Sequence, residues 1–345
     1  MSQDAMTGEE LRQFREARGM AQQELAELLN TALSRRYDRN RISRWENSAE
    51  RIPQGVIVTL RGMAGGAPSG IPAAAAGPAS VVVWVNQKGG VGKTTSTVNV
   101  AYLLAKAGKR VLVVDCDPQA NATIHFGVDP HEREVAKRTL THVMFGPLPV
   151  QEAAMTVCGG LIDLLPCSIS LSNADAELTR EPNGNLILRE KLDEVRNAYD
   201  FVMLDCPPNL GQITVSALNA ADQVVIPSQT EMLSIMGIPM LLETLSKVQR
   251  RVNPRIAILG ILPTLHKARR AQDQAMAAEL RQLAAANRIR LFDVVRDAPE
   301  YAKGVTAGVP GLVINPAAAG ADAYHEVAQA LLALPNHERA DHAAA

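Results

Sequence analysis

The stretch that most constrains this chain is residues 81–95, which reads VVVWVNQKGGVGKTT. Its first five residues are apolar and four of them are valine, which predicts a buried β-strand. A glycine-rich loop follows, and we expect an amphipathic helix from Gly92 through Leu104. A strand, a glycine-rich loop, a Lys-Thr pair and a helix in this order form a phosphate-binding loop.

Each part of this loop has a chemical reason. Gly89, Gly90 and Gly92 let backbone N–H groups curl around phosphate oxygens, because no Cβ stands in the way. The helix N-terminus adds partial positive charge. Lys93 is placed to reach the β- and γ-phosphates, and the Thr94 hydroxyl is placed to ligate Mg²⁺. The predicted nucleotide-binding residues are Lys88, Gly89, Gly90, Val91, Gly92, Lys93, Thr94 and Thr95.

A second lysine, Lys88, stands ahead of the glycines. The run KGGVGKTT closely resembles the deviant Walker A motif of the ParA/MinD superfamily of ATPases. In that superfamily the extra lysine reaches across a dimer interface to the partner's nucleotide. The resemblance implies an ATPase that uses ATP and Mg²⁺, forms an ATP-dependent homodimer, and needs Lys88 and Lys93 for catalysis. The alternative is a chance glycine-rich turn, which would not account for an eight-residue match in this strand–helix context.

The pattern after Ser80 alternates between apolar strands and helical periodicity. It predicts an α/β fold, a mostly parallel sheet with helices on both faces. Strands are expected at residues 81–85, 111–114, 161–165, 201–204, 223–226 and 256–262, with an edge strand near 289–294. Helices are expected near residues 93–107, 185–197, 212–220, 232–252 and 270–286. Ligands bind at the carboxyl ends of the strands in such sheets.

Two of these strands are followed by aspartates. Asp115 and Asp117, in VVDCDPQAN, lie two apart on an extended segment and so point to the same side. This run resembles the superfamily's D-x-D-P-Q motif, by which Asp117 orients the attacking water and Asp115 lies near the metal's water shell. The run FVMLDCPPN resembles Walker B, whose aspartate, here Asp205, holds Mg²⁺ through water. A carboxylate beside the γ-phosphate can position a nucleophile and accept its proton. The alternative for the first run is an acidic turn.

The first sixty residues predict a separate helical domain. Helices are expected at residues 8–18, 22–29 and 39–47, with a fourth beginning at residue 56. Gly19 ends the first helix, and Asp38 can N-cap the third after a connection of unusual length over residues 31–37. Short helices with a tight turn describe a helix-turn-helix. The sequence resembles the Xre/Cro-type domain of phage repressors, which implies that Ile42 and Trp45 are core residues.

The same resemblance implies a DNA-reading face. Residues 35–44 hold five arginines and one aspartate. Arginine pairs with guanine O6 and N7 and asparagine with adenine N6 and N7, while neighbouring arginines suit phosphates. The predicted DNA contacts of this domain are Gln22, Arg39, Asn40, Arg41 and Arg44. The alternative is a solvated helical bundle that binds protein.

Composition limits the remaining possibilities. A net charge of −1 excludes a globally basic nucleic-acid binder, so DNA contacts must come from local patches. Four cysteines without C-x-x-C spacing indicate free thiols in a reducing cytoplasm. The acidic N-terminus has no apolar run, and no stretch approaches the ~20 apolar residues of a membrane span. We therefore expect a soluble cytoplasmic protein.

The predicted domain boundaries follow these patterns. Residues 1–62 form the helix-turn-helix domain, residues 63–79 a flexible Gly/Ala/Pro linker, residues 80–335 the ParA-like ATPase domain and residues 336–345 a disordered tail. Residues 321–345 contain no lysine and one arginine, unlike the basic amphipathic helix with which MinD-like relatives bind membranes. Basic residues gather instead in the last third of the chain, where ParA relatives bind DNA without sequence preference. The predicted contacts there are Arg269, Arg270 and Arg296.

Together these features predict a DNA-partition ATPase. ATP would dimerise it and enable non-specific, nucleoid-associated DNA binding, and hydrolysis stimulated by a ParB-type centromere-binding partner would release it. The N-terminal domain would bind an operator and repress the partition operon. The alternatives are a transcription repressor whose ATPase controls its oligomerisation, or a positioning ATPase for another cargo.

Overall fold

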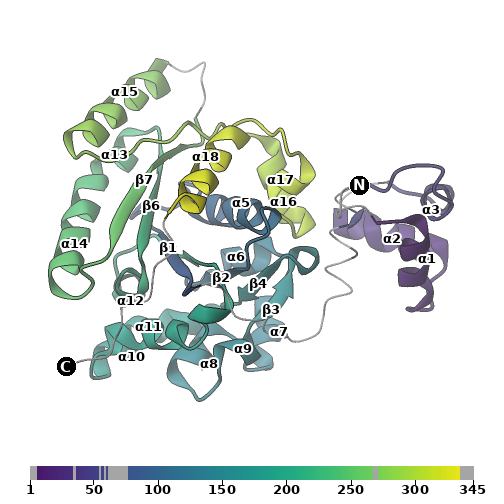
Figure 1. The fold of residues 1–345 in the computed structure, drawn as a ribbon, viewed down its shortest axis with the longest axis horizontal. Helices are drawn as coiled ribbons and strands as arrows, with labels where there is room; N and C mark the ends of the chain where they lie inside the picture. The colour runs from purple at the N-terminus through teal and green to yellow at the C-terminus, as the bar shows by residue number, and fades with distance from the viewer. Residues whose placement is uncertain are drawn as a thin grey trace.

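The computed structural model describes residues 6–33, 36–53, 56–57, 60, 77–266 and 271–334. Its N-terminal helices are α1 (Gly8–Glu16), α2 (Gln22–Leu33) and α3 (Arg39–Glu46), seen at the right of Figure 1. Thr7 and Glu10 form a capping box at the start of α1. The Asp38 side chain caps α3 as predicted, by accepting a hydrogen bond from the Arg41 amide.

The core of this small domain is the predicted one. Ile42 and Trp45 are fully buried, and they pack in one cluster with apolar residues of α1 and α2. The second helix, however, is longer than predicted, because it continues past Leu29 to Leu33. Leu33 continues the four-residue spacing of Leu25 and Leu29, and no glycine or proline intervenes to stop the helix. The Asn30 side chain bonds both backbone groups of Tyr37 and so closes the connection.

The larger domain is a three-layer α/β structure, which confirms the predicted fold class. Its strands are β1 (Ser80–Trp84), β2 (Val111–Asp115), β3 (Met155–Val157), β4 (Ile162–Leu165), β5 (Phe201–Asp205), β6 (Gln223–Gln229) and β7 (Ala257–Thr264). In the described residues they form one sheet in the order β3-β4-β2-β5-β1-β6-β7. Every pairing is parallel except that of β3 with β4.

Helices cover both faces of this sheet (Figure 1). They are α5 (Lys93–Lys106), α6 (Asn121–His125), α7 (Pro130–Val135), α8 (Leu140–Phe145), α9 (Val150–Ala153), α10 (Ala174–Arg180), α11 (Ile187–Asp193), α12 (Gln212–Ala220), α13 (Met232–Met236), α14 (Ile238–Arg251), α15 (Ala271–Ala286), α16 (Pro299–Ala307), α17 (Gly311–Ile314) and α18 (Ala321–Leu332). Short 3₁₀ turns lie at Cys158–Gly160, Ile169–Asn173, Gly184–Leu186 and Arg196–Ala198.

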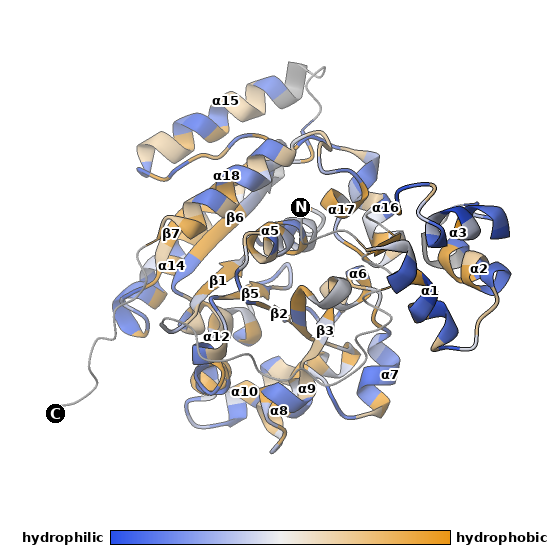
Figure 2. Cartoon of the chain, turned by 45° about the vertical axis from the view of Figure 1, so that its right-hand side comes forward, coloured by the Kyte–Doolittle hydropathy of each residue, from blue (hydrophilic) through white to orange (hydrophobic). Residues whose placement is uncertain are grey.

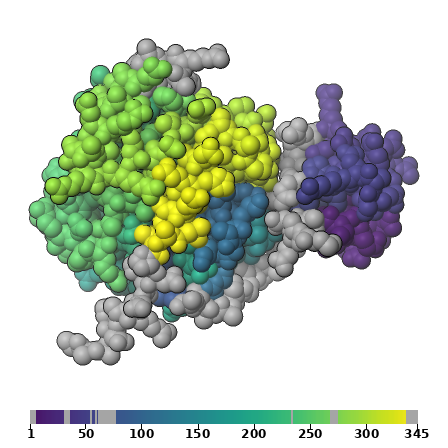
Figure 3. Space-filling model, turned by 45° about the horizontal axis from the view of Figure 1, so that its top comes forward, coloured from purple at the N-terminus to yellow at the C-terminus, as the bar shows by residue number. Residues whose placement is uncertain are grey.

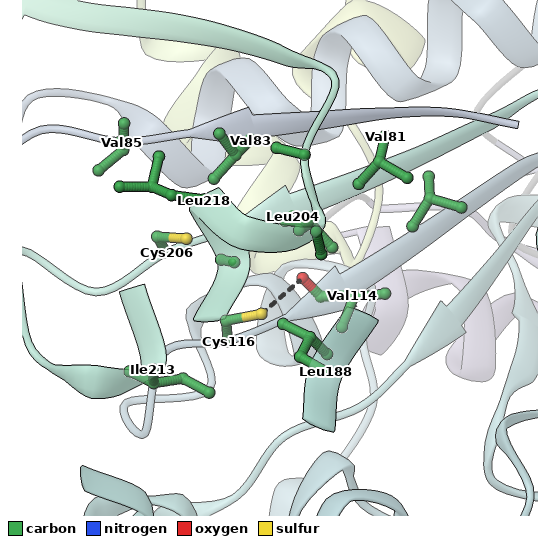
Figure 4. Close-up of a cluster of buried hydrophobic side chains, with 14 of the residues drawn as sticks. Val81, Val83, Val85, Val114, Cys116, Leu188, Leu204, Cys206, Ile213 and Leu218 are labelled. Carbon is green, nitrogen blue, oxygen red and sulfur yellow. Dashed lines mark hydrogen bonds between the residues drawn. The ribbon is translucent and has the colours of Figure 1, made fainter. Parts of the chain in front are cut away.

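Two apolar cores result from the alternation of side chains along each strand. Val81 and Val83 of β1 face the core beneath α8, α11, α12 and α14, whereas Val82 and Trp84 face the core beneath α5 and α18. Figure 4 shows the first core, in which Cys116 and Cys206 lie among valines and leucines. The central strands are accordingly the most apolar ribbons in Figure 2, as expected for a sheet buried on both sides.

The chain enters this domain through an anchored segment. The Ala79 amide donates to the Arg196 carbonyl at 2.8 Å, and Nε of Arg196 donates back to the Ala79 carbonyl at 2.8 Å. Arg196 also pairs with Asp222, whose Oδ2 accepts the Val81 amide at 2.8 Å. Strand β1 therefore starts from a fixed point at the amino edge of the sheet, between β5 and β6.

Three predictions of secondary structure are wrong. Residues 289–294 form no strand, although they run beside β7 with an isolated bridge between Ile261 and Leu291. The helix predicted at 232–252 is divided at Gly237, where proline at residue 239 cannot donate within a continuous helix. The helix predicted at 185–197 is α11 flanked by two 3₁₀ turns. Strand β3 and helices α6–α10, α16 and α17 were not predicted, because they are short or lack a clear period.

Helix α18 lies across α5, as Figure 3 shows for the yellow and blue surfaces. Its Tyr324 is buried against Tyr301 with the rings edge to face, 5.6 Å between centroids. Among the described residues, no helix combines the length and apolarity that crossing a bilayer requires. The buried residues of α18 belong to the second core of the larger domain.

A buried histidine at the end of α6 makes stability depend on pH. His125 is 1% exposed, and burial lowers its pKa to about 4, partly offset by a hydrogen bond to the backbone of Val309. Between pH 6.5 and 4 the unfolded chain binds a proton that the folded chain rejects, so stability falls as pH falls. At pH 5 this residue costs about 2 kcal/mol relative to pH 7.

Urea unfolding at pH 7.5 and 5.0 measures this effect. In His125→Gln the loss of stability between these pH values is expected to be smaller than in the wild type by about 2 kcal/mol. Other titrating groups act on both proteins alike, so the difference isolates His125. Equal losses in the two proteins would show that its protonation is not linked to folding.

Candidate functional site

The phosphate-binding loop joins β1 to α5 in the predicted arrangement. Gly90 and Gly92 have φ of +73° and +78°, which residues with side chains rarely adopt. Gly92 is the N-cap of α5, and no side chain caps that end, so its first N–H groups are left for another acceptor. Thr264, at the end of β7, donates from its hydroxyl to the Val91 carbonyl at 2.7 Å and holds the back of the loop. This geometry is an anion site.

The two lysines of the loop have different surroundings. Lys93 is buried, and its ammonium donates to the Lys88 carbonyl at 3.2 Å. Burial lowers the pKa of Lys93, and the nearby Asp205 carboxylate is the largest opposing influence. Lys88 instead directs its ammonium away from the loop, to Glu231 after β6, at 2.6 Å. Lys93 is thus positioned for a phosphate held by its own loop, whereas Lys88 is not.

Asp205 and Thr94 lie together at the mouth of the loop. The Thr94 hydroxyl donates to Oδ2 of Asp205 at 2.6 Å. Asp205 is fully buried, and its pKa is raised first by burial and then by the neighbouring charge of Asp115. Hydroxyl and carboxylate oxygens are the ligands that Mg²⁺ prefers. The raised pKa means that the ionised carboxylate is unfavourable at this buried position, and a bound cation would stabilise it. The residues present therefore fit a magnesium ion held by Thr94 and Asp205.

Asp115 and Asp117 differ in how many hydrogen bonds their carboxylates accept. Asp115 is fully buried and accepts the amide and hydroxyl of Thr123, at 2.8 and 2.7 Å, and the Asp117 amide at 3.1 Å. Burial is also the main cause that raises its pKa. Asp117 accepts only the Gln119 amide, at 2.9 Å, among the hydrogen bonds described for its side chain. Asp115 thus shapes the turn that presents Asp117, and the catalytic and metal roles assigned to this pair stay predictions.

A cavity beside the loop brings in residues that the motifs did not identify. It has a volume of about 210 Å³ and opens against Gly92 and Thr95. Its wall comes from Thr264, from Asp297 in the segment after α15, and from Tyr301 of α16. Residues 295–305 reach this place only because the chain passes alongside β7 after α15. No local sequence pattern indicated their participation.

The predicted DNA-reading face of α3 is exposed in part as expected. Arg39 and Asn40 are exposed, and within the described residues their side chains form no hydrogen bond or ion pair. Arg41 and Arg44 are also exposed, but both pair with Glu50. These pairs partly neutralise the two arginines, and the DNA contacts assigned to all four residues stay predictions.

Gln22 is placed differently from the prediction of an outward contact. It is half-buried, and its amide donates to Oε2 of Glu46 at 2.8 Å. Glu46 is 4% exposed and also binds Arg15 at 2.6 Å, which together with Gln22 keeps its pKa low against the opposing effect of burial. The Gln22 side chain therefore supports the packing of α1 and α2 against α3, and a base contact stays a prediction.

The C-terminal basic residues are only partly visible. Arg269 and Arg270 lie outside the described residues. Arg296 is exposed, in the segment between Val295 and Asp297, both of which line the cavity beside the phosphate-binding loop. A DNA contact by Arg296 would thus lie close to the nucleotide site.

Comparison with known proteins agrees with these two domains. The family model described as an AAA domain matches residues 79–258, and the model described as a helix-turn-helix matches residues 11–59. The chromosome partitioning protein ParA of Caulobacter vibrioides is 33% identical over 266 residues, covering 74% of this chain and 95% of that protein. The sporulation initiation inhibitor protein Soj of Bacillus subtilis is 33% identical over 254 residues, covering 73% and 98%.

Solved structures are similar over the same region. A Mycobacterium smegmatis protein described as cobyrinic acid a,c-diamide synthase, with bound ADP and magnesium, is 33% identical, with a TM-score of 0.61 over 74% of this chain and 94% of that one. A Cyanothece McdA variant in complex with ATP is 22% identical, with a TM-score of 0.67 over 76% of this chain and all of that one. The second likeness concerns the fold alone.

Proposed function

Because this chain belongs to the ParA/Soj family of partition ATPases, we propose that it segregates DNA through a slow, Mg²⁺-dependent cycle of ATP binding and hydrolysis. The observation that carries this proposal is the grouping of Lys93, Thr94 and Asp205 at the uncapped start of α5. The M. smegmatis relative, whose structure holds ADP and magnesium, supports the same ligands for this chain.

The chain's own residues suggest how ATP would be held. The phosphates would accept hydrogen bonds from the N–H groups of residues 89–95. The Lys93 ammonium would donate to a phosphate oxygen in place of the Lys88 carbonyl. Magnesium, held by Thr94 and Asp205, supplies neutralisation of phosphate charge. The neighbouring cavity, with Asp297 and Tyr301 in its wall, would take the base and ribose. Asp117 would orient the attacking water and accept its proton.

The cycle would couple nucleotide state to DNA. Two ATP-loaded copies would meet face to face, with Lys88 reaching the partner's nucleotide, and the dimer would bind DNA without sequence preference through basic residues such as Arg296. A ParB-type centromere-binding partner would stimulate hydrolysis and release the dimer. The protein would accordingly work in the cytoplasm on the nucleoid.

A second function rests on the N-terminal domain. Its match to a helix-turn-helix and the exposed Arg39 and Asn40 of α3 favour binding to an operator. One such domain covers a half-site, so useful affinity requires a dimer on paired half-sites. The chain would then repress its own operon, or act mainly as a repressor whose oligomerisation is controlled by ATP.

The two DNA-binding modes are expected to be separable. The double substitution Arg39→Ala with Asn40→Ala should abolish the operator footprint, because it removes the base-reading groups while leaving the buried core of α3 intact. The same protein should still bind random DNA with ATP but not with ADP, and this binding should weaken steeply with salt. Footprinting and random-sequence binding assays at several salt concentrations measure both.

A version lacking residues 1–62 provides the complementary test. Its random-DNA binding should match that of the full chain, because the ATPase domain has cores of its own. If the shortened protein showed no ATP-dependent binding to random DNA, the partition cycle would be wrong and the ATP-regulated repressor would be the better description.

A further inference from the structure

The N-terminal domain and the larger domain are in contact at α16. This helix lies on the side of the larger domain that faces α1–α3 (Figure 1), and it packs against α2. Its last residue, Ala307, is half-buried and packs against the apolar core of the N-terminal domain. The same residue packs against the second core of the larger domain. One side chain of α16 therefore takes part in the packing of both domains.

The same helix forms one wall of the cavity beside the phosphate-binding loop. Tyr301, Ala302 and Val305 of α16 line this cavity, together with Gly92 and Thr95 of the loop. Tyr301 is buried, whereas Val305 is 41% exposed. A helix of nine residues thus borders the cavity along one side and reaches the N-terminal domain at its end.

Close backbone packing fixes the end of α16 to its neighbours. Gly308 follows the helix with φ of +66°, and a Cβ on it would stand 2.9 Å from the Cα of Gly127. A Cβ on Gly304 would likewise stand 2.6 Å from the carbonyl oxygen of Val309. These contacts leave no space for α16 to shift without its neighbours. A restraint on α16 at the cavity is therefore transmitted to Ala307.

Helix α6 connects α16 to the turn that carries Asp117. The Ala120 amide, at the N-cap of α6, donates to the Asp117 carbonyl at 2.8 Å. The His125 side chain, at the other end of α6, is hydrogen-bonded to the backbone of Val309 just beyond α16. Helix α6 also packs against α16 itself. The cavity and the Asp117 turn, two parts of the candidate site, therefore both lead to this helix.

We propose that α16 couples nucleotide binding to the docking of the N-terminal domain, so that each strengthens the other. The inference rests on the proposed function, which places the base and ribose of a nucleotide in the cavity. A nucleotide in that position holds α16 through Tyr301 and Val305. The N-terminal domain holds the same helix through Ala307. The contact between the domains thus responds to the filling of the nucleotide site.

The coupling is positive because both contacts restrict the motion of one helix. Whichever forms first orders α16, and the second then loses less conformational entropy when it forms. Linkage makes the effect reciprocal, so docking raises nucleotide affinity by the same factor by which nucleotide favours docking. The contact between the domains is small, since Ala307 is only half-buried. We therefore expect a factor at the low end of measured couplings, about fivefold.

Hydrogen exchange of the full chain tests the coupling, with ADP as the probe. Mass spectrometry compares peptides from the phosphate-binding loop, from α16 and from α2, with and without saturating ADP. ADP should slow exchange in the loop and in α16, which border its site. It should also slow exchange by up to about fivefold in α2, which it reaches only through α16.

Two negative results of this experiment have different meanings. Protection of the loop and of α16 without any protection of α2 would overturn the coupling and leave the proposed function intact. An absence of protection in the loop itself would refute the proposed nucleotide site, and the coupling with it.

A charge at the contact between the domains should break the coupling. Ala307→Asp places a carboxylate against the core of the N-terminal domain, where burial disfavours it. In this variant ADP should still slow exchange in the loop and in α16, but no longer in α2. Thr306→Asp is the matched control, because it adds the same charge one residue earlier at an exposed position, and it should keep the response of α2. If Ala307→Asp kept that response as well, the proposal would be wrong.

Calorimetric titration with ADP measures the reciprocal effect. Ala307→Asp should bind ADP about fivefold more weakly than the wild type, whereas Thr306→Asp should bind it equally well. The version lacking residues 1–62, whose ATPase domain has cores of its own, should show the same weaker affinity. Ala307→Asp should then cause no further loss in that version, since the contact is already absent. A further loss there, or equal affinities in all the full-length proteins, would overturn the proposal.

Discussion

Replacing Lys93 by alanine is expected to remove nucleotide binding almost completely. Lys93 is buried at the first residue of α5, where its charge interacts with the carboxylates of Asp205 and Asp117. Without it, the phosphates would approach these carboxylates with no opposing charge. Deleting one partner of a buried charge pair costs roughly 3–5 kcal/mol, which corresponds to a loss in affinity of about 10²–10⁴-fold.

Calorimetric titration with ADP and with an ATP analogue measures this loss. Lys106→Ala, at the exposed end of the same helix, is the matched control and should bind both nucleotides like the wild type. Urea unfolding of Lys93→Ala shows whether the domain stays folded. A folded Lys93→Ala protein that binds within tenfold of the wild type would contradict the role assigned to this lysine.

Asp117→Ala is expected to bind ATP normally and to hydrolyse it about 10²–10⁴-fold more slowly, the range over which a positioned general base contributes. The Asp117 carboxylate lies near enough to Lys93 to interact with its charge, and in the described structure it accepts no hydrogen bond other than that of the Gln119 amide. Because the deletion acts on the water more than on the phosphates, ATP-bound dimers should accumulate. Single-turnover hydrolysis and sedimentation with ATP measure the two effects.

The turn itself requires a control. Asp129 also accepts an amide two residues ahead, that of His131 at 2.7 Å, but it is exposed and caps α7. Asp129→Ala loses an equivalent turn hydrogen bond and should hydrolyse ATP at nearly the wild-type rate. If Asp117→Ala did the same, its catalytic assignment would be wrong and the side chain would only stabilise the loop.

The central part of the site could be predicted because its chemistry is local in sequence. Lys93 and Thr94 follow a buried strand and a glycine-rich loop, so their place at a helix N-terminus is determined by neighbours within fifteen residues. Asp205 could be added because parallel strands bring their carboxyl ends to one edge. The register confirms this, since Asp205 pairs with Trp84 on one side and Asp115 on the other.

The parts that were missed depend on contacts between distant segments. Glu231 meets Lys88 only after β6 has paired with β1, and Asp297 and Tyr301 reach the cavity only because the chain follows β7 after α15. The bond from the Gln22 amide to the buried Glu46 of another helix was also not predicted, although the DNA contact assigned to Gln22 stays a prediction. These polar side chains are bonded to residues that are distant in sequence, and a local sequence pattern does not identify such partners.

The anchored entry of β1 has a mechanical consequence. If DNA holds the N-terminal domain while the ATPase domain is held elsewhere, tension enters the larger domain at Ala79. The hydrogen bonds of Arg196 and Asp222 to the start of β1 carry this tension first. The hydrogen bonds that join β1 to β5 and β6 carry it next, and they are loaded in shear along their whole length. Breaking such an arrangement requires many hydrogen bonds to rupture together, so it resists force through a slow unfolding rate. The phosphate-binding loop, at the far end of the same strand, is shielded from the pull.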